Sequence, residues 1–324
     1  MSAFTVIQPG IHSLLQDHGR FGHHSIGLTT GGPMDSQSFQ WANRLCQNTA
    51  ECAAIEVTVG GLVLEANIST SIAVTGAAVP LSINQQPAAL WQTHRVKVGD
   101  RIELGFAPVG SRSYLAVAGG FQASPSFGSQ STVPREGLGG LHQDGKPLQT
   151  GDQLPCLALK QQPPIHRLAK SQRPKFSADN SAHCRVILGY QQQAFSAVQK
   201  QVFFSSEYQV SDSSDRMGYR LNGPAIKPAL DGILSEGICL GAIQVPADGQ
   251  PIVLLADRQT IGGYPKIGSV LSLDLGKLAQ VTPGGTVSFE AISIEQAHNL
   301  LVLNQRQFDS TEFESVDIDE EPQL

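Results

Sequence analysis

The sequence predicts a mainly β protein, built as two tandem β-barrel modules with a few short helices. The 33 Gly and 19 Pro among 324 residues favour short strands and tight turns. Most apolar segments are short and are bounded by Gly, Pro, Asn or Asp, as strands are. A glycine turn leads into an apolar run at 98–104, 150–157 and 283–289. Because this turn recurs in both halves, the two modules are expected to be related barrels.

The clearest strand candidates combine apolar or β-branched residues with flanking turn residues. They are LVLEA (62–66), SIAVTG (71–76), DRIELGF (100–106), SYLAVAGG (113–120), CRVILG (184–189), PIVLLA (251–256) and GTVSFEAIS (285–293).

One helix is expected in the first half, over residues 35–48. Asp35 is its N-cap candidate, because a carboxylate there can accept from the free N–H groups of the first turn. Phe39, Ala42 and Leu45 recur at helical spacing on one face. Two shorter helices are expected in the second half, at 275–280 and 295–305.

The chain is expected to divide into two modules and two connecting or terminal segments. Residues 1–159 form the N-terminal β-rich module, and residues 183–305 form the C-terminal barrel. The polar, Pro-containing residues 160–182 lack apolar periodicity and are interpreted as a linker. Residues 306–324 are strongly acidic and are expected to be a disordered tail.

Composition excludes several classes of protein. With a formal net charge of −6, the chain lacks the clustered Lys and Arg of a general nucleic-acid binder. Its five Cys show no CxxC spacing, and its His residues form no metal-spaced set, so no metal site is predicted. No signal peptide or membrane-spanning run is visible, so a cytoplasmic protein is expected.

The stretch DRQTIGGYPK (257–266) places many functional groups directly after an apolar run. A strand without polar alternation is buried on both faces, and a loop just beyond it can aim side chains at a ligand. Asp257 is a candidate base or orienting group, and Arg258 and Lys266 can stabilise an oxyanion or a phosphoryl oxygen. The other candidates in this stretch are Gln259, Gly262, Gly263 and Tyr264. The alternative interpretation is an Asp–Arg ion pair that closes the loop.

A second cluster lies in SDSSDRMGYRL (211–221). Arg216 and Arg220 can clamp a carboxylate or phosphate in bidentate fashion, with Tyr219 beside them. Asp215 is a candidate for orienting water or a metal. The alternative is an exposed hairpin with paired charges.

Two weaker candidates lie outside these clusters. Gln244, in IQVP before an Asp-Gly turn, either contacts a ligand or lies exposed on a hairpin. Gly31 and Gly32 lead into the helix capped by Asp35, where backbone N–H groups can hold an anion or form an interface. The alternative there is a tight turn and an ordinary cap.

These stretches together resemble the KipA-like family, also known as the C subunit of 5-oxoprolinase or as allophanate hydrolase subunit 2. The motifs GLTTGGPMDSQSFQWANRL, YLAVAGGF, GSQST, SDRMGYRL, SEG and GAIQVPADGQPIVLLADRQTIGGYPKIG occur in the expected order. The resemblance runs from about residue 5 to 300, and the motif at 241–268 is its most specific part. The family is similar to half of the carboxyltransferase domain of urea carboxylase.

The resemblance implies that the second barrel is cyclophilin-like and that the chain acts in a complex. It implies a KipI-like partner, the B subunit of 5-oxoprolinase, and a third protein, the LamB/YcsF-like A subunit. Such a complex uses ATP with Mg²⁺ to open the lactam of 5-oxo-L-proline to L-glutamate, and one chain alone is expected to be inactive. By their match to the family motifs, Arg216, Arg220, Arg258 and Lys266 become candidates for holding phosphate and developing negative charge.

Two other functions stay open at this point. A carboxyltransferase would pass a carboxyl group from carboxybiotin to urea or a related amide. The three Met are 1, 34 and 217, so this chain has no Met-Lys-Met biotinylation motif, and another chain would have to carry the biotin. A non-enzymatic KipA-type regulator would instead bind a KipI-like inhibitor of a histidine kinase.

Overall fold

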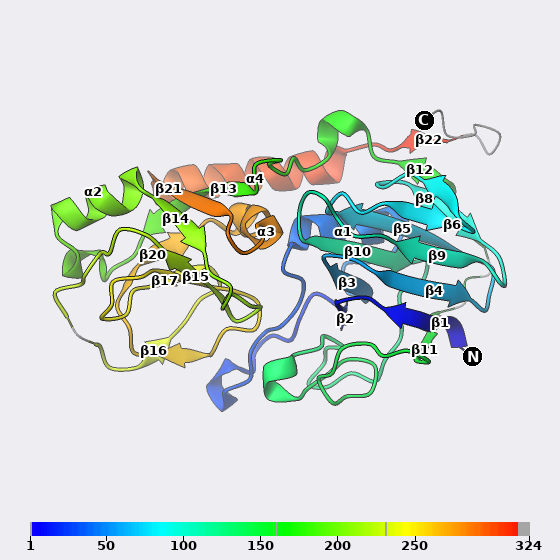
Figure 1. Cartoon of the computed structure of the whole chain (residues 1–324), viewed down its shortest axis with the longest axis horizontal. Coiled ribbons are helices and arrows are strands. Elements are labelled where there is room, and N and C mark those ends of the chain that lie inside the picture. The colour runs from blue at the N-terminus through cyan, green and yellow to red at the C-terminus, as the bar shows by residue number, and fades with distance from the viewer. Residues whose placement is uncertain (1, 158, 160, 231, 317–324) are drawn as a thin grey trace. The chain divides into compact units, whose positions relative to one another are not determined.

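A computed structural model describes residues 2–157, 159, 161–230 and 232–316 of the chain. The chain divides into two compact units (Figure 1). The first unit comprises Met1–Arg20, Gly31–Phe176 and Glu312–Leu324, and the second comprises Phe21–Thr30 and Ser177–Thr311. Each unit therefore receives a segment from a distant part of the sequence.

The first unit consists of two antiparallel sheets. One has the order β11-β1-β4-β9-β6-β7 and the other the order β2-β3-β10-β5-β8. Buried residues of both sheets, such as Phe4, Leu64, Ile55 and Leu115, belong to one hydrophobic core. The strands are β1 (Ser2–Pro9), β2 (His12–Gln16), β3 (Ala54–Thr58), β4 (Leu62–Ala66), β5 (Thr70–Gly76), β6 (Leu81–Ile83), β7 (Gln86–Ala88), β8 (Thr93–Val96), β9 (Arg101–Leu104), β10 (Arg112–Val117) and β11 (Gln153–Pro155).

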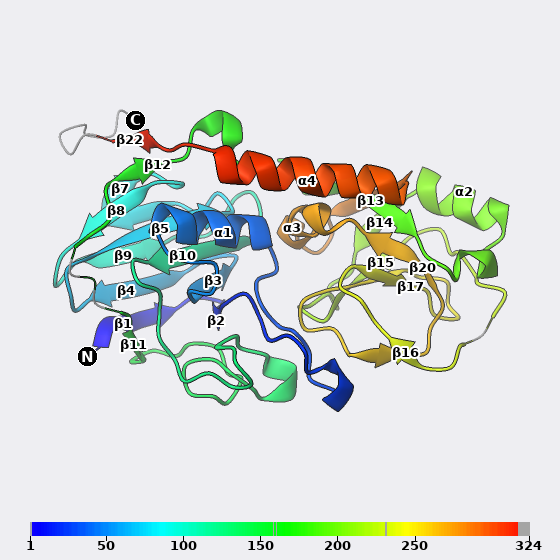
Figure 2. The ribbon, with the colours of Figure 1, turned by 180° about the vertical axis from the view of Figure 1, so that it is seen from behind.

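Helix α1 (Ser36–Leu45) covers the outer face of the five-stranded sheet (Figure 2). Asp35 caps it as predicted, because its carboxylate accepts from the Ser38 N–H at 3.1 Å. The buried Phe39 packs edge-on against Tyr114 of β10, with ring centroids 6.0 Å apart. The predicted helix is confirmed, although it ends at Leu45 and not at residue 48.

The second unit is a closed barrel of seven strands in the order β13-β20-β17-β18-β15-β14-β21. The pairing of β13 with β21 is parallel, and the other pairings are antiparallel. The strands are β13 (Ser181–Leu188), β14 (Glu207–Val210), β15 (Gly218–Asn222), β17 (Ala242–Gln244), β18 (Ile252–Leu254), β20 (Lys266–Val270) and β21 (Thr286–Ile292). A separate two-stranded ribbon joins β16 (Glu236–Gly237) to β19 (Ile261–Gly262).

Helices and short turns complete the two units. The α-helices of the second unit are α2 (Ala197–Ser205), α3 (Ser272–Gln280) and α4 (Ile294–Ser310). Single turns of 3-10 helix are η1 (His24–Ile26), η2 (Pro134–Glu136), η3 (Lys170–Gln172) and η4 (Gln192–Ala194). No helix in the described residues is both long and apolar enough to cross a membrane.

The mainly β fold and the closed second barrel are confirmed. The first module differs in detail, because its described strands form two sheets that pack face to face and do not close into one barrel. The recurring glycine turns are also explained. Gly99, Gly151 and Gly284 have φ of +87°, +91° and +85°, a left-handed conformation that favours glycine.

The predicted disordered tail is wrong for the part of it that the structure describes. Helix α4 continues to Ser310, and β22 (Glu314–Ser315) pairs with β12 (His166–Arg167) inside the predicted linker. Phe313 packs against Trp41, with ring centroids 6.0 Å apart. The Phe313 ring contact and the β12–β22 pairing thus order this segment despite its acidic composition, while residues 317–324 of the predicted tail lie outside the described residues.

We predict that Phe313→Ala lowers the free energy of unfolding by about 1–3 kcal/mol, below the value for a fully buried Phe. The substitution removes the contact with Trp41 and the Arg44 guanidinium, which lies 5.2 Å from the Phe313 ring centroid. Chemical denaturation measures the change. The exposed neighbour Glu312 provides the control Glu312→Ala, and equal stability of the two variants would contradict the predicted anchor.

Candidate functional site

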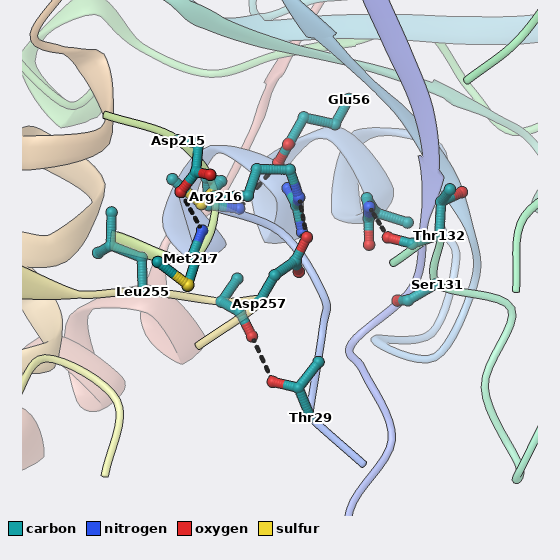
Figure 3. A network of polar contacts seen from close by, with 12 residues as sticks. Thr29, Glu56, Ser131, Thr132, Asp215, Arg216, Met217, Leu255 and Asp257 are labelled. Carbon is teal, nitrogen blue, oxygen red and sulfur yellow. Dashed lines mark hydrogen bonds and ion pairs between the residues drawn. The ribbon is translucent and has the colours of Figure 1, made fainter. Parts of the chain in front are cut away.

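The 257–266 loop starts at a buried ion pair between Asp257 and Arg216 (Figure 3). Arg216 Nε and Nη2 donate to the two Asp257 carboxylate oxygens at 2.8 and 2.9 Å. Both side chains are buried, with exposed fractions of 7 and 3 %. Such bidentate, charge-assisted pairs are strong and directional, so the pair fixes how the chain leaves β18.

Backbone hydrogen bonds extend the same connection. The Asp257 N–H donates to the Arg216 carbonyl at 2.9 Å, and the Leu255 N–H donates to Met217 O at 2.9 Å. Asp215 Oδ1 accepts from the Met217 N–H at 2.8 Å, which tightens the turn before β15 (Figure 3). Thr29 Oγ1 donates to the Ala256 carbonyl at 3.3 Å, so the N-terminal segment of this unit also holds the start of the loop.

These contacts bear on the sequence-based interpretations of the two clusters. Both Asp257 oxygens accept from Arg216, and the role of Asp257 as a base or orienting group stays a prediction. The predicted Asp–Arg pair exists, but its cation is Arg216. The predicted clamp of Arg216 and Arg220 is not formed, because Arg216 is committed to Asp257 while Arg220 lies exposed on β15. Asp215 is bound by backbone N–H groups of its own turn, as in an Asx turn.

Arg258 is a buried cation that finds no carboxylate in the described residues. Its Nε donates to the Ile238 carbonyl at 3.2 Å, and its Nη1 donates to the Leu255 carbonyl at 3.4 Å. Burial lowers the pKa of this guanidinium below its ordinary value. Carbonyl oxygens do not neutralise a positive charge. An anion next to the Arg258 guanidinium would therefore stabilise it further.

Lys266 lies at the start of β20 in a polar cluster. Its ammonium pairs with Glu236 of β16, whose Oε1 also accepts from the Tyr190 hydroxyl and from Gln191 Nε2, the latter at 2.7 Å. The Lys266 hydrogen bond, and then that of Tyr190, hold the pKa of Glu236 below its ordinary value. The same carboxylate raises the pKa of Tyr190. This cluster ties the β16–β19 ribbon to β20.

Gln244 is buried at the end of β17, with an exposed fraction of 2 %. Its Nε2 is shielded from solvent and has no hydrogen-bond partner in the described residues. The β17–β20 ladder pairs Gln244 with Lys266. Gly262 of β19 lies directly beside it, because a Cβ at position 262 would come within 2.5 Å of Gln244 Nε2.

The remaining predicted residues have varied surroundings. Tyr219 is a core residue whose hydroxyl donates to the Ala279 and Val281 carbonyls at 3.3 and 3.2 Å. The Tyr219 hydroxyl therefore points to these core carbonyls and does not lie beside Arg220 as part of the predicted phosphate clamp. Tyr264 is exposed, and Gly263 accepts a hydrogen bond from the Ile233 N–H at 2.9 Å. Gln259 is half-buried beside Gly262.

The glycine turn before α1 binds an anion of the chain itself. The Met34 N–H donates to Glu56 Oε2 at 2.8 Å, and the Asp35 N–H donates to the Tyr114 hydroxyl at 2.7 Å. Tyr114 in turn donates to Glu56 Oε2 at 2.7 Å. Glu56 thus occupies the Met34 N–H and the Tyr114 hydroxyl occupies the Asp35 N–H, so these two donors do not face an external anion, whereas the anion site predicted at Gly31 and Gly32 themselves stays a prediction.

Comparison with known proteins places this arrangement in a family. The carboxyltransferase domain, subdomain A and B, family matches residues 26–291. The chain belongs to this carboxyltransferase A/B family. It is 36 % identical to the C subunit of 5-oxoprolinase from Escherichia coli over 94 % of this chain and 96 % of the relative. It is 36 % identical to the same-named protein of Haemophilus influenzae over 90 % of this chain and 92 % of the relative.

A solved structure of the same family has the same fold. The Kluyveromyces lactis urea carboxylase matches 98 % of this chain at a TM-score of 0.89 and 30 % identity. This chain corresponds to 30 % of that protein. The carboxyltransferase A/B fold therefore occurs both as a separate chain and as part of a larger protein.

Sequence reasoning missed three residues of the carboxyltransferase A/B chain that surround Lys266. The Lys266 ammonium pairs with Glu236, and the Lys266 N–H donates to Gln191. Tyr190 donates to the same Glu236 carboxylate. Glu236 belongs to the SEG motif of the family, so the resemblance contained a signal for it. Nothing in the spacing of Tyr190 and Gln191 connects them to residue 266, because only barrel closure brings them together.

We predict that Asp257→Ala lowers the free energy of unfolding by about 3–5 kcal/mol, since it breaks the buried bidentate pair with Arg216. Denaturant unfolding measures the loss. The exposed Asp212 provides the control Asp212→Ala, which is expected to change stability little. Replacing both members, Arg216→Met with Asp257→Leu, should recover part of the loss because both charges of the pair are then removed together. A loss no larger than that of Asp212→Ala would contradict a structural role for the pair.

We predict a pH-dependent contribution from Glu236. Its folded-state pKa is below the ordinary 4.5, so its stabilising effect is present above that value and is lost as the pH falls through the folded-state pKa. The stability difference between the wild type and Glu236→Gln should thus be constant near neutral pH and shrink below about pH 4.5. Denaturation at a series of pH values tests this, and a pH-independent difference would refute it.

Proposed function

We propose that this chain is the C subunit of a 5-oxoprolinase, which opens 5-oxo-L-proline to L-glutamate. The observation that carries the proposal is the 36 % identity to the Escherichia coli protein of that name, across 94 % of this chain and 96 % of the relative. A match over nearly both full lengths supports the same role for the whole chain. The buried cations around the 257–266 loop fit the charge of an anionic substrate.

The chemistry explains why a lactam-opening enzyme of this kind would need cations and ATP. A lactam is stabilised by resonance and resists water. Phosphorylation of its carbonyl oxygen by ATP with Mg²⁺ would activate the amide carbon for attack by water. The ring C–N bond would then break with the nitrogen leaving as the amine, a second water would release phosphate from the resulting acyl phosphate, and nearby cations would stabilise the negative charge. We assign this supporting role to Arg258 and Lys266, which are both buried in the second unit.

We further propose that the chain works in a cytoplasmic complex with two other proteins, a KipI-like one and a LamB/YcsF-like one. Several large apolar side chains around the β16–β19 ribbon support contact with another protein. Leu234 is 93 % exposed, Ile261 60 % and Tyr264 44 %. Exposed apolar side chains grouped in this way are typical of protein-interaction sites.

A carboxyltransferase is the second candidate function, favoured by the family and by the match to urea carboxylase. It would take a carboxyl group from carboxybiotin on another chain and pass it to urea or a similar amide. Both candidates bring a carboxylate to the site, since 5-oxoproline and carboxybiotin are each anions, so the cation Arg258 is compatible with either one.

We predict that the purified chain alone does not open 5-oxoproline, and that adding the KipI-like and LamB/YcsF-like partners produces activity dependent on ATP and 5-oxoproline. Coupled measurement of ATP hydrolysis and L-glutamate formation tests both statements. The control reaction replaces 5-oxoproline with urea and carboxybiotin. Transfer to urea without lactam opening would favour the carboxyltransferase. Binding of a KipI-like protein with neither activity would favour a KipA-type regulator.

A further inference from the structure

Three donors converge on one carboxylate oxygen of Glu236 in the second unit. The Lys266 ammonium and the Tyr190 hydroxyl both donate to Glu236 Oε1, and Gln191 Nε2 donates to the same atom at 2.7 Å. Hydrogen bonds of this kind, which end on a charged oxygen, are the strong ones in proteins. One cation and two neutral donors around a single anionic oxygen are the components of an oxyanion-binding site.

Two of these donors are positioned by the barrel and not by Glu236. Lys266 begins β20, whose backbone pairs with β17 inside the closed barrel. Gln191 Oε1 accepts from the Lys266 N–H at 2.8 Å, which leaves the Nε2 side of the same amide to face the carboxylate. Glu236 itself belongs to β16, which forms a two-stranded ribbon with β19 and is not a strand of the barrel. The donors and the acceptor are therefore held by different elements.

The exposure of Glu236 distinguishes its ion pair from the pairs made by Asp257 and Asp274. In those two pairs the carboxylate side chain is buried, with exposed fractions of 4 % for Asp257 and 0 % for Asp274. In the third pair the burial is reversed, because the Lys266 side chain is 10 % exposed and the Glu236 side chain is 31 % exposed. A buried ion is costly to leave without a partner, whereas a partly hydrated carboxylate can return to water. Glu236 is thus the member of its pair that an external anion can replace.

We propose that Lys266, Tyr190 and Gln191 form an oxyanion-binding site that Glu236 occupies as long as no ligand is bound. The ligand class is a small anion with a carboxylate or phosphate oxygen, which takes the place of Glu236 Oε1. The site follows from the contacts of Glu236, while its use by 5-oxo-L-proline or by a phosphoryl group rests on the proposed 5-oxoprolinase function. Glu236 is then an internal competitor of the ligand.

Internal competition sets the size of the expected effect. The apparent affinity of a ligand is its intrinsic affinity multiplied by the fraction of molecules whose site is vacant. A vacant fraction of about 10 to 1 % corresponds to an affinity that is about 10- to 100-fold weaker than that of the free site. Removal of the Glu236 charge should therefore raise the affinity for an anion by about this factor.

Binding of three ligands to the full-length chain, measured by calorimetry or ligand-observed NMR, tests the site directly. The ligands are inorganic phosphate, 5-oxo-L-proline and the neutral lactam 2-pyrrolidinone. Glu236→Gln should bind at least one of the two anions about 10- to 100-fold more tightly than the wild type and leave 2-pyrrolidinone binding unchanged. A gain for phosphate alone assigns the site to a phosphoryl group, and a gain for 5-oxo-L-proline alone assigns it to the substrate carboxylate. If neither anion gains affinity, the inference fails.

A matched variant controls for net charge. Glu290 is an exposed carboxylate on β21 of the same unit, so Glu290→Gln removes the same charge away from Lys266 and should leave anion binding unchanged. In the Glu236→Gln background, Lys266→Met should abolish the gain. Tyr190→Phe should weaken anion binding about 10-fold there, the scale of one hydrogen bond to a charged group, and its 75 % exposed position tolerates the change if Lys266→Met does not fold. Equal gains in Glu290→Gln and Glu236→Gln would overturn the assignment.

Stability separates an internal competitor from a carboxylate that only holds the ribbon in place. Glu236→Gln breaks the ion pair, so its melting temperature without ligand should be below that of the wild type. A ligand that binds the folded chain stabilises it by an amount that grows with ligand concentration divided by Kd. The same concentration of the anion should therefore raise the melting temperature of Glu236→Gln more than that of the wild type. An equal rise in both proteins would show that the site is not vacated and would contradict the inference.

Kinetics of the reconstituted complex separate failure of the site from failure of the function. If the complex opens 5-oxoproline and Tyr190→Phe and Lys266→Met leave its KM and kcat unchanged, the function stands and the site is wrong. If the complex does not open 5-oxoproline, the proposed function fails. Anion binding to the isolated chain then decides the site separately, because that measurement requires no turnover.

Discussion

The bidentate ion pair between Arg216 and Asp257 is the contact on which the geometry of the 257–266 loop depends. It joins the turn before β15 to the end of β18, with backbone hydrogen bonds on either side of it. Two charges are expensive to bury, and only good geometry offsets that cost. The pair therefore holds the loop in one path, which places Gly262 beside the buried Gln244 and brings Arg258 to the Ile238 carbonyl.

The second unit thus assigns different roles to charges that look alike in sequence. Arg216 and Asp257 neutralise each other and position the loop. Lys266 pairs with Glu236 and anchors the β16–β19 ribbon to β20. Among the described residues Arg258 donates only to carbonyl oxygens, so a bound anion would stabilise its charge. Within the part of the chain that the structure describes, a carboxylate thus reaches Arg216 and Lys266 but not Arg258.

The first unit contains a parallel case in which a predicted binding position is used internally. The glycine turn before α1 does expose N–H groups suited to an anion. The chain supplies that anion from β3, where Glu56 accepts from Met34 and from Tyr114. Burial, together with the charges of Glu56 and Asp35, raises the pKa of Tyr114 well above its ordinary value, so its hydroxyl remains a donor. This network fastens α1 to the five-stranded sheet.

Local elements and family membership follow from the sequence alone. Short apolar runs between turn residues mark the strands, Asp35 marks the start of α1, and left-handed glycines explain the repeated turns. These features depend on residues close in sequence, so composition and spacing predict them. The partner that each polar group receives is settled only in the folded chain. Asp257 lies beside Arg258 in sequence but pairs with Arg216, and Phe313 anchors a segment whose acidic composition predicted disorder. Barrel closure and burial bring these partners together from positions far apart in the sequence. A pattern of neighbouring residues therefore does not predict which groups pair.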